Sequence, residues 1–339
     1  GTHQKANANK NKHKDVEVEI IKKVYEDKLL EEINEDRIKH HKKKIDRLIQ
    51  KEVMFDEATG ELIENKDTKH IKESITDPES GCFHKGEKEK CFAYTHQVFC
   101  DKNGFVLAKT TTPGNVHDSV AFFEVYNTLN KKFKDQIKNV CLDAGYVNPA
   151  ICREIILNGH TPLMPYKRPM TSKDFFKKYE YAYDEYNDCY ICPNNQVLSY
   201  STTNRDGYRE YKSCGKVCAD CPYLSQCTES KEHIKVVMRH IWEPYMERCE
   251  DIRHTIGVKE LYDQRKETIE RIFGTAKENH GFRYTQMKGK ARMELKVGLT
   301  FTCMNLKKLA EMLHKRALKE HCFCILFKNM CDNRTIYRK

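Results

Sequence analysis

The sequence lacks the features that would place a protein in a membrane or outside the cell. It has no apolar run of membrane-spanning length, and its first residues do not form a signal peptide. We therefore expect a soluble protein of the cytoplasm. Gly1 is not preceded by Met, so we expect a fragment or a processed form. A chain of 339 residues can bury a large core, as one elaborated domain or as two.

Acidic residues are outnumbered by basic ones. The chain has 60 Lys and Arg against 50 Asp and Glu, and a formal net charge of +10. This balance favours an acidic partner, of which nucleic acid is the commonest. The 16 cysteines, in a long lysine-rich chain without a signal, predict thiols rather than disulfides, and some of these thiols are expected to bind metal.

Residues 1–76 are predicted to be a polar start followed by a charged helical region. From Val16 to about Lys66, apolar residues recur at roughly helical spacing, which predicts one or two exposed helices in a hairpin. A basic band in this region is either a solvated helix face or a contact surface for the DNA backbone. The band consists of Arg37, Lys39, His40, His41, Lys42, Lys43, Lys44 and Arg47.

Residues 77–180 are predicted to be the first part of an α/β core. Two strand-like stretches, 91–99 and 105–111, flank a turn at 101–104 and predict a hairpin. The following elements are a helix capped by Asp118 or Ser119, a strand over 139–143, a helix starting at Asn148 and Pro149, and a strand over 160–166. This order predicts a mixed sheet with flanking helices.

Residues 181–235 form a cysteine-rich insertion. Cys189-x-x-Cys192 and Cys218-x-x-Cys221 have the form of a structural zinc site that staples a small, zinc-ribbon-like unit. Cys227 is a further candidate ligand, and Cys227 or Cys214 could replace one of the four. An iron–sulfur cluster and unligated thiols are the alternatives.

Residues 236–316 are predicted to be the second part of the core, and 317–339 a C-terminal tail. The central stretch, 261–284, predicts a helix that ends at Gly281. Its expected buried stripe consists of Leu261, Ile269, Ile272, Phe273 and Ala276. A further helix over 293–315 is expected to pack on the sheet.

Two carboxylates stand out in these patterns. Asp143 ends a predicted strand, where open α/β sheets place ligands, although a simple turn or cap residue would look the same. Glu270 lies on the central helix with Lys266 four residues before it and Lys277 seven residues after it. This arrangement suits metal-assisted chemistry on a polyanion, and the alternative is that Glu270 only pairs with Lys266 across one turn.

At Asp143 and Glu270 the chain resembles the DDE-type transposases of bacterial insertion sequences. The matching stretches are GTHQKANANK, GEKEKCFAYTHQVFCDKNGFVL, TPGNVHDS, CLDAGY, the cysteine segments CPNNQ and CADCP, and RKETIERIFGTAKENHGFRY. They occur in the order that the family has and cover most of the chain. Tyr262 and Arg265, which correspond to the residues upstream of the family's glutamate, are displaced from their usual positions by one residue.

The resemblance implies an RNase H-like fold and DNA cleavage followed by strand transfer. It makes Asp143 the second aspartate and Glu270 the glutamate of a set that holds two Mg²⁺ or Mn²⁺ ions. The DNA-binding candidates are Lys277, Arg283, Arg265 and Lys266. The first aspartate would precede Gly1, so the chain as given is expected to bind metal poorly and to be nearly inactive. The resemblance implies a homodimer on DNA.

Three other functions are compatible with the same sequence patterns. A non-catalytic DNA-binding remnant would use the same basic surfaces and a structural zinc site. A zinc-organised scaffold for protein partners would have no salt-sensitive DNA affinity. A hydrolytic nuclease would share the carboxylate site but lack strand transfer.

Overall fold

The computed structural model describes residues 2–4, 13–19, 24–46, 48, 53–55, 62–64, 68–85, 89–167 and 174–332. Helices and several sheets are interleaved along the chain, so the fold is of the mixed α/β class that the sequence predicts. None of the helices in these ranges is long and apolar enough to cross a membrane.

The largest sheet has seven strands. They are β1 (Thr2–Gln4), β2 (His13–Glu19), β5 (Thr68–Ser74), β6 (Gly81–Lys85), β7 (Glu89–Cys100), β8 (Val106–Pro113) and β16 (Tyr284–Thr285). The order is β16-β1-β7-β6-β5-β2, and β8 also pairs with β7. Strands β7 and β8 form the predicted hairpin: Gly104, with φ 79°, donates to the carbonyl of Asp101 at 2.9 Å and closes the turn.

A second unit follows the hairpin. It contains α2 (Asp118–Phe133), β9 (Asn139–Cys141), α3 (Pro149–Leu157) and β10 (Thr161–Leu163), with one-turn 3-10 helices at Lys134–Gln136 and Ala144–Tyr146. Strands β9 and β10 are parallel. As predicted, Asn148 caps the N-terminus of α3: its side chain accepts the N–H of Ala150 at 2.9 Å. The prediction for α2 was wrong by one or two residues, because the ring of His117 accepts the N–H of Ser119 and caps the helix.

The cysteine-rich insertion forms an antiparallel sheet of five strands. In order, they are β11 (Ala182–Asp184), β12 (Cys189–Ile191), β13 (Val197–Thr203), β14 (Tyr208–Lys212) and β15 (Val236–His240). A 3-10 turn, Lys178–Glu180, precedes the sheet, and two short helices, α4 (Gly215–Ala219) and α5 (Leu224–Cys227), lie between its last two strands. One face is covered by a cluster of Tyr181, Tyr190, Leu198, Tyr211 and Val237.

The predicted helical hairpin near the N-terminus is confirmed only in part. Among the described residues of 16–66, α1 (Glu26–Lys39) is helical, whereas β3 (Val53–Phe55) and β4 (Leu62–Glu64) pair as strands. Strand β2 pairs with β5 in one continuous register, from His13 opposite Ser74 to Glu19 opposite Thr68. Cross-strand pairing therefore overrides the helical spacing of the apolar residues. Arg47 of the basic band lies outside the described residues.

The last part of the chain is helical. It contains α6 (Glu243–Arg253), α7 (Val258–Arg265), a π-helical turn (Lys266–Glu270), α8 (Arg271–Asn279) and α9 (Lys290–Asp332). Helices α8 and α9 share an apolar cluster with Tyr94 of β7, to which α9 contributes Met293, Val297 and Phe301. This confirms that α9 packs on the sheet, here on β8. Gly281, with φ 58°, follows the end of α8 as expected.

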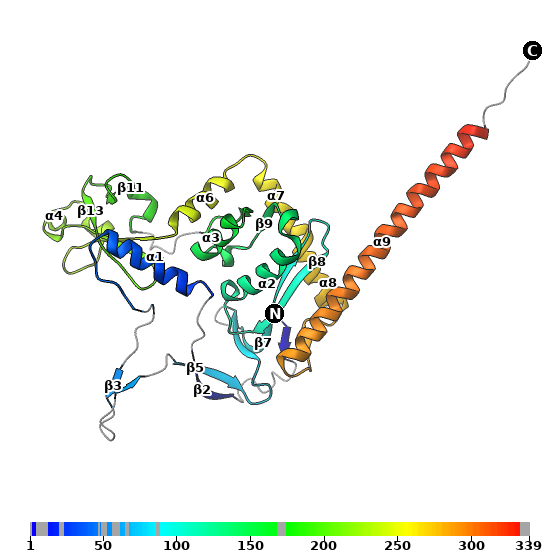
Figure 1. Ribbon diagram of the computed structural model, residues 1–339, viewed down its shortest axis with the longest axis horizontal. Helices are drawn as coiled ribbons and strands as arrows, with labels where there is room; N and C mark the ends of the chain where they lie inside the picture. Colours follow the sequence, from blue (N-terminus) through cyan, green and yellow to red (C-terminus); the bar gives the residue numbers. More distant parts are fainter. Residues whose placement is uncertain are drawn as a thin grey trace, which may run out of the picture.

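Figure 1 shows how these units are arranged. The β7–β8 hairpin lies beside α8 and the first part of α9, and the rest of α9 extends away from the body. Helices α2 and α3 lie in the middle, and α1 runs beside the sheet that contains β11 and β13. The core of the middle unit joins α1, α2, α3 and α6 through Ile33, Phe122, Ile151 and Trp242.

Candidate functional site

Asp143 lies in the loop that follows β9. One carboxylate oxygen accepts the N–H of Ala144 at 2.8 Å, so the residue does cap the short turn behind it. Its other oxygen, Oδ2, lies 3.0 Å from a guanidinium nitrogen of Arg265. The side chain is 58% exposed. Capping and a role at a cation site are therefore compatible, because the two oxygens face different partners.

Glu270 reaches the same guanidinium from the helical side. Its Oε1 lies 3.5 Å from Arg265, and the side chain is 56% exposed. Arg265 itself is only 18% exposed. Two carboxylates that are far apart in the sequence thus converge on one mostly buried cation. Their role as metal ligands stays a prediction.

A π-helical turn explains how Arg265 reaches Glu270. Residues five apart in an α-helix do not face each other, whereas those three or four apart do. The turn over Lys266–Glu270 is π-helical, and such a turn accommodates one extra residue and is common at functional sites. The one-residue displacement noted in the sequence is absorbed within this turn, so that Arg265 faces the two carboxylates.

The same turn explains where the predicted buried stripe fails. Ile272 and Ala276 are buried as expected, and Ile269 and Phe273 pack partly against the same cluster. Leu261, before the π-helical turn, is 42% exposed, so its predicted burial was wrong. Because the π-helical turn holds one residue more than an α-helical turn, the residues before it are rotated about the helix axis relative to those after it. This rotation places Leu261 away from the core.

A third carboxylate approaches this corner through a relay of side chains. Gln97 on β7 donates to Oδ1 of Asp118 at 2.6 Å and accepts the hydroxyl of Tyr146. Burial raises the pKa of Tyr146, and the charges of Asp118 and Asp143 raise it further. The charges of Asp118 and Asp143 thus both act on the hydroxyl of Tyr146.

Two partly buried thiols and a tyrosine lie near Arg265 and the π-helical turn. Burial raises the pKa of Cys100 and of Cys141 to about 11, so both thiols are neutral at pH 7. Thr268 of the π-helical turn hydrogen-bonds with Cys100, and the charge of Arg265 acts on Cys141. The ring centroid of Tyr262 lies 5.9 Å from the Arg265 guanidinium carbon. The sequence patterns do not single out these residues; the position of Cys141 two residues before Asp143 is the one local signal.

The predicted DNA-binding residues occupy different positions around this corner. Arg265 is engaged by both carboxylates, Lys266 lies 3.3 Å from Asp263, and Arg283 pairs with Glu278. Lys277 is half-buried on α8. Their contacts with DNA stay a prediction.

Four of the five predicted zinc ligands line a single cavity of about 20 Å³. They are Cys192, Cys218, Cys221 and Cys227. Their sulfurs are held by weak contacts: Cys192 accepts the N–H of Gln196 at 3.3 Å, and Cys227 lies 3.3 Å from the hydroxyl of Tyr181. As these side chains are positioned, no three His, Cys, Asp or Glu residues of the described ranges form a group that could hold a metal ion.

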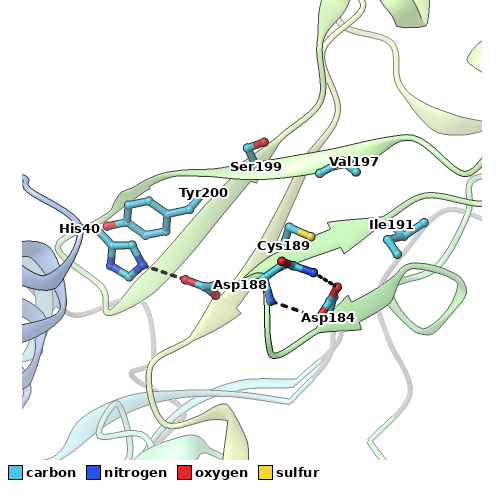
Figure 2. A pocket seen from close by; sticks show the side chains of 9 residues that line it. His40, Asp184, Asp188, Cys189, Ile191, Val197, Ser199 and Tyr200 are labelled. Atoms are coloured by element: carbon cyan, nitrogen blue, oxygen red, sulfur yellow. Dashed lines mark hydrogen bonds and ion pairs between the residues drawn. The ribbon is translucent and has the colours of Figure 1, made fainter.

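The fifth predicted ligand, Cys189, is placed elsewhere, which corrects the proposed set. Side chains three residues apart along a strand point to opposite faces, because the faces alternate. Cys189 and Ile191 therefore line an open pocket of about 440 Å³ with Val197 and Ser199 of the neighbouring strand, whereas Cys192 faces the cavity. Figure 2 shows this pocket, with His40 and Asp188 at one end.

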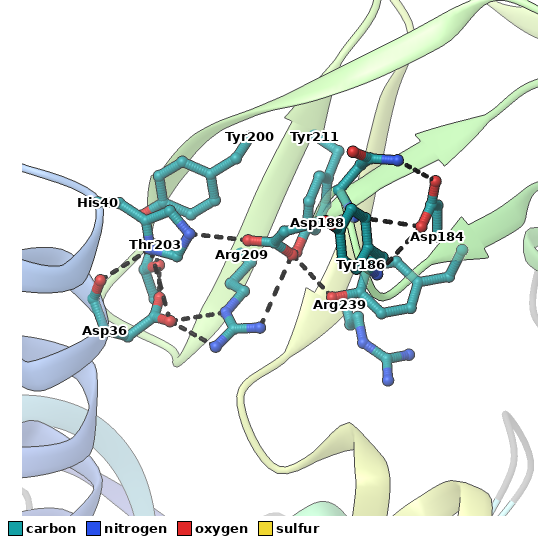
Figure 3. A network of polar contacts seen from close by, with 12 residues as sticks. Asp36, His40, Asp184, Tyr186, Asp188, Tyr200, Thr203, Arg209, Tyr211 and Arg239 are labelled. Atoms are coloured by element: carbon teal, nitrogen blue, oxygen red, sulfur yellow. Dashed lines mark hydrogen bonds and ion pairs between the residues drawn. The ribbon is translucent and has the colours of Figure 1, made fainter.

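A polar network beside this pocket joins α1 to the sheet. Arg209 on β14 donates to Asp36 of α1 at 2.8 Å and lies 4.0 Å from Asp188. The ring of His40 lies 2.7 Å from Asp188 and stacks on Tyr200. Figure 3 shows that these groups come from both elements and face one another. Two members of the basic band, His40 and Arg37, thus make contacts within the protein: His40 contacts Asp188, and Arg37 donates to Thr202 at 3.0 Å.

A comparison with protein families gives a match over part of the chain. Residues 191–310 match a family model described as a transposase DDE domain. The matched range contains Arg265, Glu270 and the four cavity thiols, whereas Asp143 and Cys189 lie before it. Neither the curated proteins nor the solved structures gave a match. On this range, the resemblance to DDE-type transposases seen in the sequence is confirmed.

Proposed function

We propose that this chain cleaves and joins DNA phosphodiester bonds with a divalent metal held by Asp143 and Glu270. The observation that carries the proposal is the pair of ion contacts that Asp143 and Glu270 make to the single guanidinium of Arg265. Two exposed carboxylates at the end of a strand and on a facing helix match the acidic residues expected of a DDE-type transposase.

These carboxylates have the chemistry that Mg²⁺ or Mn²⁺ requires. Hard divalent ions prefer carboxylate oxygens and keep several waters when protein ligands are few. A bound ion of this kind activates water and stabilises the leaving oxygen in phosphoryl transfer. Asp143 would supply Oδ2, since its Oδ1 already accepts the N–H of Ala144. Glu270 would supply a carboxylate oxygen from the facing helix.

The order of elements supports an RNase H-like core. The β7–β8 hairpin is followed by α2, the parallel strands β9 and β10 flanking α3, and finally the helix that carries Glu270. In this arrangement Asp143 follows β9 directly, at the end of the strand where ligands of α/β sheets bind.

DNA is the substrate that the charge of the chain favours. The formal net charge is +10, and Lys266, Lys277 and Arg283 lie on the same helical segment as Glu270 or just after it. These side chains would hold phosphates, Arg283 in the bidentate manner that guanidinium groups favour. A homodimer at paired DNA ends is part of this proposal.

We further propose that Cys192, Cys218, Cys221 and Cys227 hold a structural zinc ion. Four thiolates are a complete ligand set for tetrahedral Zn²⁺, and these four side chains line one cavity of about 20 Å³. Binding requires rotations of the thiols from their present contacts. The ion would connect β12 to α4 and α5, which have little core of their own, and it would therefore act by stabilising the fold.

The experiment uses the full-length product of the gene, with any residues that precede Gly1. Nicking of supercoiled plasmid DNA is measured with Mg²⁺, with Mn²⁺ and with EDTA, for the wild type, Asp143→Asn and Glu270→Gln. We expect either substitution to lower the rate roughly a hundred- to a thousand-fold, because each removes a ligand of a catalytic metal. DNA retention on a gel should be unchanged.

Two results would count against the proposal. Nicking that survives both substitutions would remove Asp143 and Glu270 from the reaction. Salt-sensitive DNA binding without metal-dependent nicking by the wild type would favour a non-catalytic DNA-binding remnant instead.

A further inference from the structure

The position of Arg265 has a consequence for metal binding, given the function proposed above. Its guanidinium lies 3.0 Å from Oδ2 of Asp143 and 3.5 Å from Oε1 of Glu270. These two carboxylates are the ones that the proposed metal needs. One side chain of the protein therefore already neutralises the ligands.

Arg265 is held in this position by its surroundings. It ends α7, immediately before the π-helical turn, and the ring of Tyr262 lies 5.9 Å from its guanidinium carbon. The side chain is 18% exposed, whereas both carboxylates are more than half exposed. A cation from solution therefore has open access to the carboxylates, on which Arg265 acts from the protein side.

We propose that Arg265 is a positioning residue that competes with the divalent metal for Asp143 and Glu270. In the metal-free protein it holds the two carboxylates near each other by offsetting their mutual repulsion. A divalent ion on the same oxygens would be repelled by the guanidinium and would have to displace it. Metal loading is therefore coupled to the release of Arg265.

The ion pairs are weak enough for such an exchange. Pairs between exposed carboxylates and a cation contribute little, because water screens them and the side chains lose freedom when they pair. Losing two such pairs corresponds to about a 3- to 30-fold weaker apparent metal affinity. Competition would thus tune the affinity without abolishing binding.

The test measures the Mn²⁺ dissociation constant of the same full-length product by isothermal titration calorimetry, without DNA. Arg265→Gln should bind Mn²⁺ about 3- to 30-fold more tightly than the wild type. The matched control is Lys259→Gln, which removes one exposed positive charge from the same helix and should leave the affinity within about two-fold. Arg265→Lys keeps the positive charge but loses the planar guanidinium. Its Mn²⁺ affinity should lie between those of the wild type and Arg265→Gln. Thermal unfolding of each variant verifies that it is folded.

The outcomes separate this inference from the proposed function. Equal or weaker Mn²⁺ binding by folded Arg265→Gln would overturn the competition. Asp143→Asn and Glu270→Gln should each weaken Mn²⁺ binding, and if neither does so, the metal site itself is refuted. Loss of binding in those two variants, together with no change in Arg265→Gln, would leave the proposed function standing and reject only the role of Arg265.

Discussion

Among the described residues, an arginine is paired with two carboxylates at two places, which differ in how many hydrogen-bond donors those carboxylates have. Arg209 lies between Asp36 and Asp188, and Arg265 lies between Asp143 and Glu270. The side chain of Asp36 is 5% exposed, whereas that of Asp143 is 58% exposed. An arginine between two carboxylates thus occurs once in a closed setting and once in an open one.

The closed cluster has a donor for each carboxylate oxygen. Asp36 accepts the hydroxyl of Thr203 at 2.5 Å as well as Arg209. Oδ1 of Asp188 accepts the hydroxyls of Tyr183 and Tyr211 at 2.7 and 2.6 Å, and its Oδ2 lies 2.7 Å from Nε2 of His40. Buried charges persist only when they are paired and hydrogen-bonded in this way. This cluster therefore has a structural role, fastening α1 to the sheet of β11–β15.

The open cluster has few donors besides Arg265 and one backbone N–H. Exposed oxygens without fixed donors can exchange one cation for another at small cost. Of the two clusters, the one formed by Arg265, Asp143 and Glu270 is therefore better suited to exchanging its arginine for a metal ion.

The largest effect is expected where the proposed zinc ion stabilises the insertion. Cys192→Ser should remove zinc from the purified protein and lower its stability by several kcal/mol, because a structural ion contributes folding free energy directly. Cys189→Ser, on the opposite face of the same segment, should retain a full equivalent of zinc. Metal content by mass spectrometry and urea unfolding measure both, and equal zinc loss from the two variants would contradict the assignment.

Removing the arginine of each cluster should have very different effects on stability. Arg209→Met leaves Asp36 buried without its cation and should cost about 3 kcal/mol or more of unfolding free energy. Arg265→Gln removes two pairs whose carboxylates are more than half exposed, and should cost less than about 1 kcal/mol. Urea denaturation at pH 7 gives both values. Similar losses of unfolding free energy in the two variants would contradict the distinction between a closed, structural cluster and an open one.

The closed cluster should also contribute to the acid sensitivity of the fold. Burial alone would raise the pKa of Asp188, but hydrogen bonds from Tyr211, Tyr183 and His40, together with the charge of Arg209, lower it overall. A lowered pKa in the folded state stabilises the protein above the pKa of the unfolded chain, and this stability is lost as the pH falls through the folded value. Asp188→Asn should therefore be less stable at pH 7 and should lose less stability between about pH 4 and pH 2. A parallel pH dependence in variant and wild type would contradict this.

The smallest effect is expected from shortening the helix of the open cluster. Deleting the exposed residue Glu267 should convert the π-helical turn into ordinary α-helix and keep Arg265 facing Glu270, with unfolding free energy within about 1 kcal/mol of the wild type. Deleting the exposed residue Thr275 of α8 should be far more damaging, because it rotates Ala276 out of the core. Circular dichroism and urea unfolding measure both. Equal losses of unfolding free energy in the two deletion variants would contradict the hypothesis that the π-helical turn accommodates one extra residue.

Local signals in the sequence predicted the elements that depend on local chemistry. The alternation that forms β7 and β8, and the capping of α3 by Asn148, follow from nearby residues. The prediction that Asp143 and Glu270 approach one another came from the family resemblance, and both reach Arg265. What the sequence could not provide depends on distant partners. The pairing of β2 with β5 is such a case, as is the placement of Cys189 on the far face of β12.

The π-helical turn also affects how relatives of this chain can be found. A search for an arginine at a fixed interval before the glutamate would reject this sequence, although the side chain lies within 3.5 Å of Glu270. The π-helical turn, rather than the residue spacing alone, sets where this side chain lies relative to the glutamate. A sequence pattern for such a site therefore needs to permit one extra residue inside the helix.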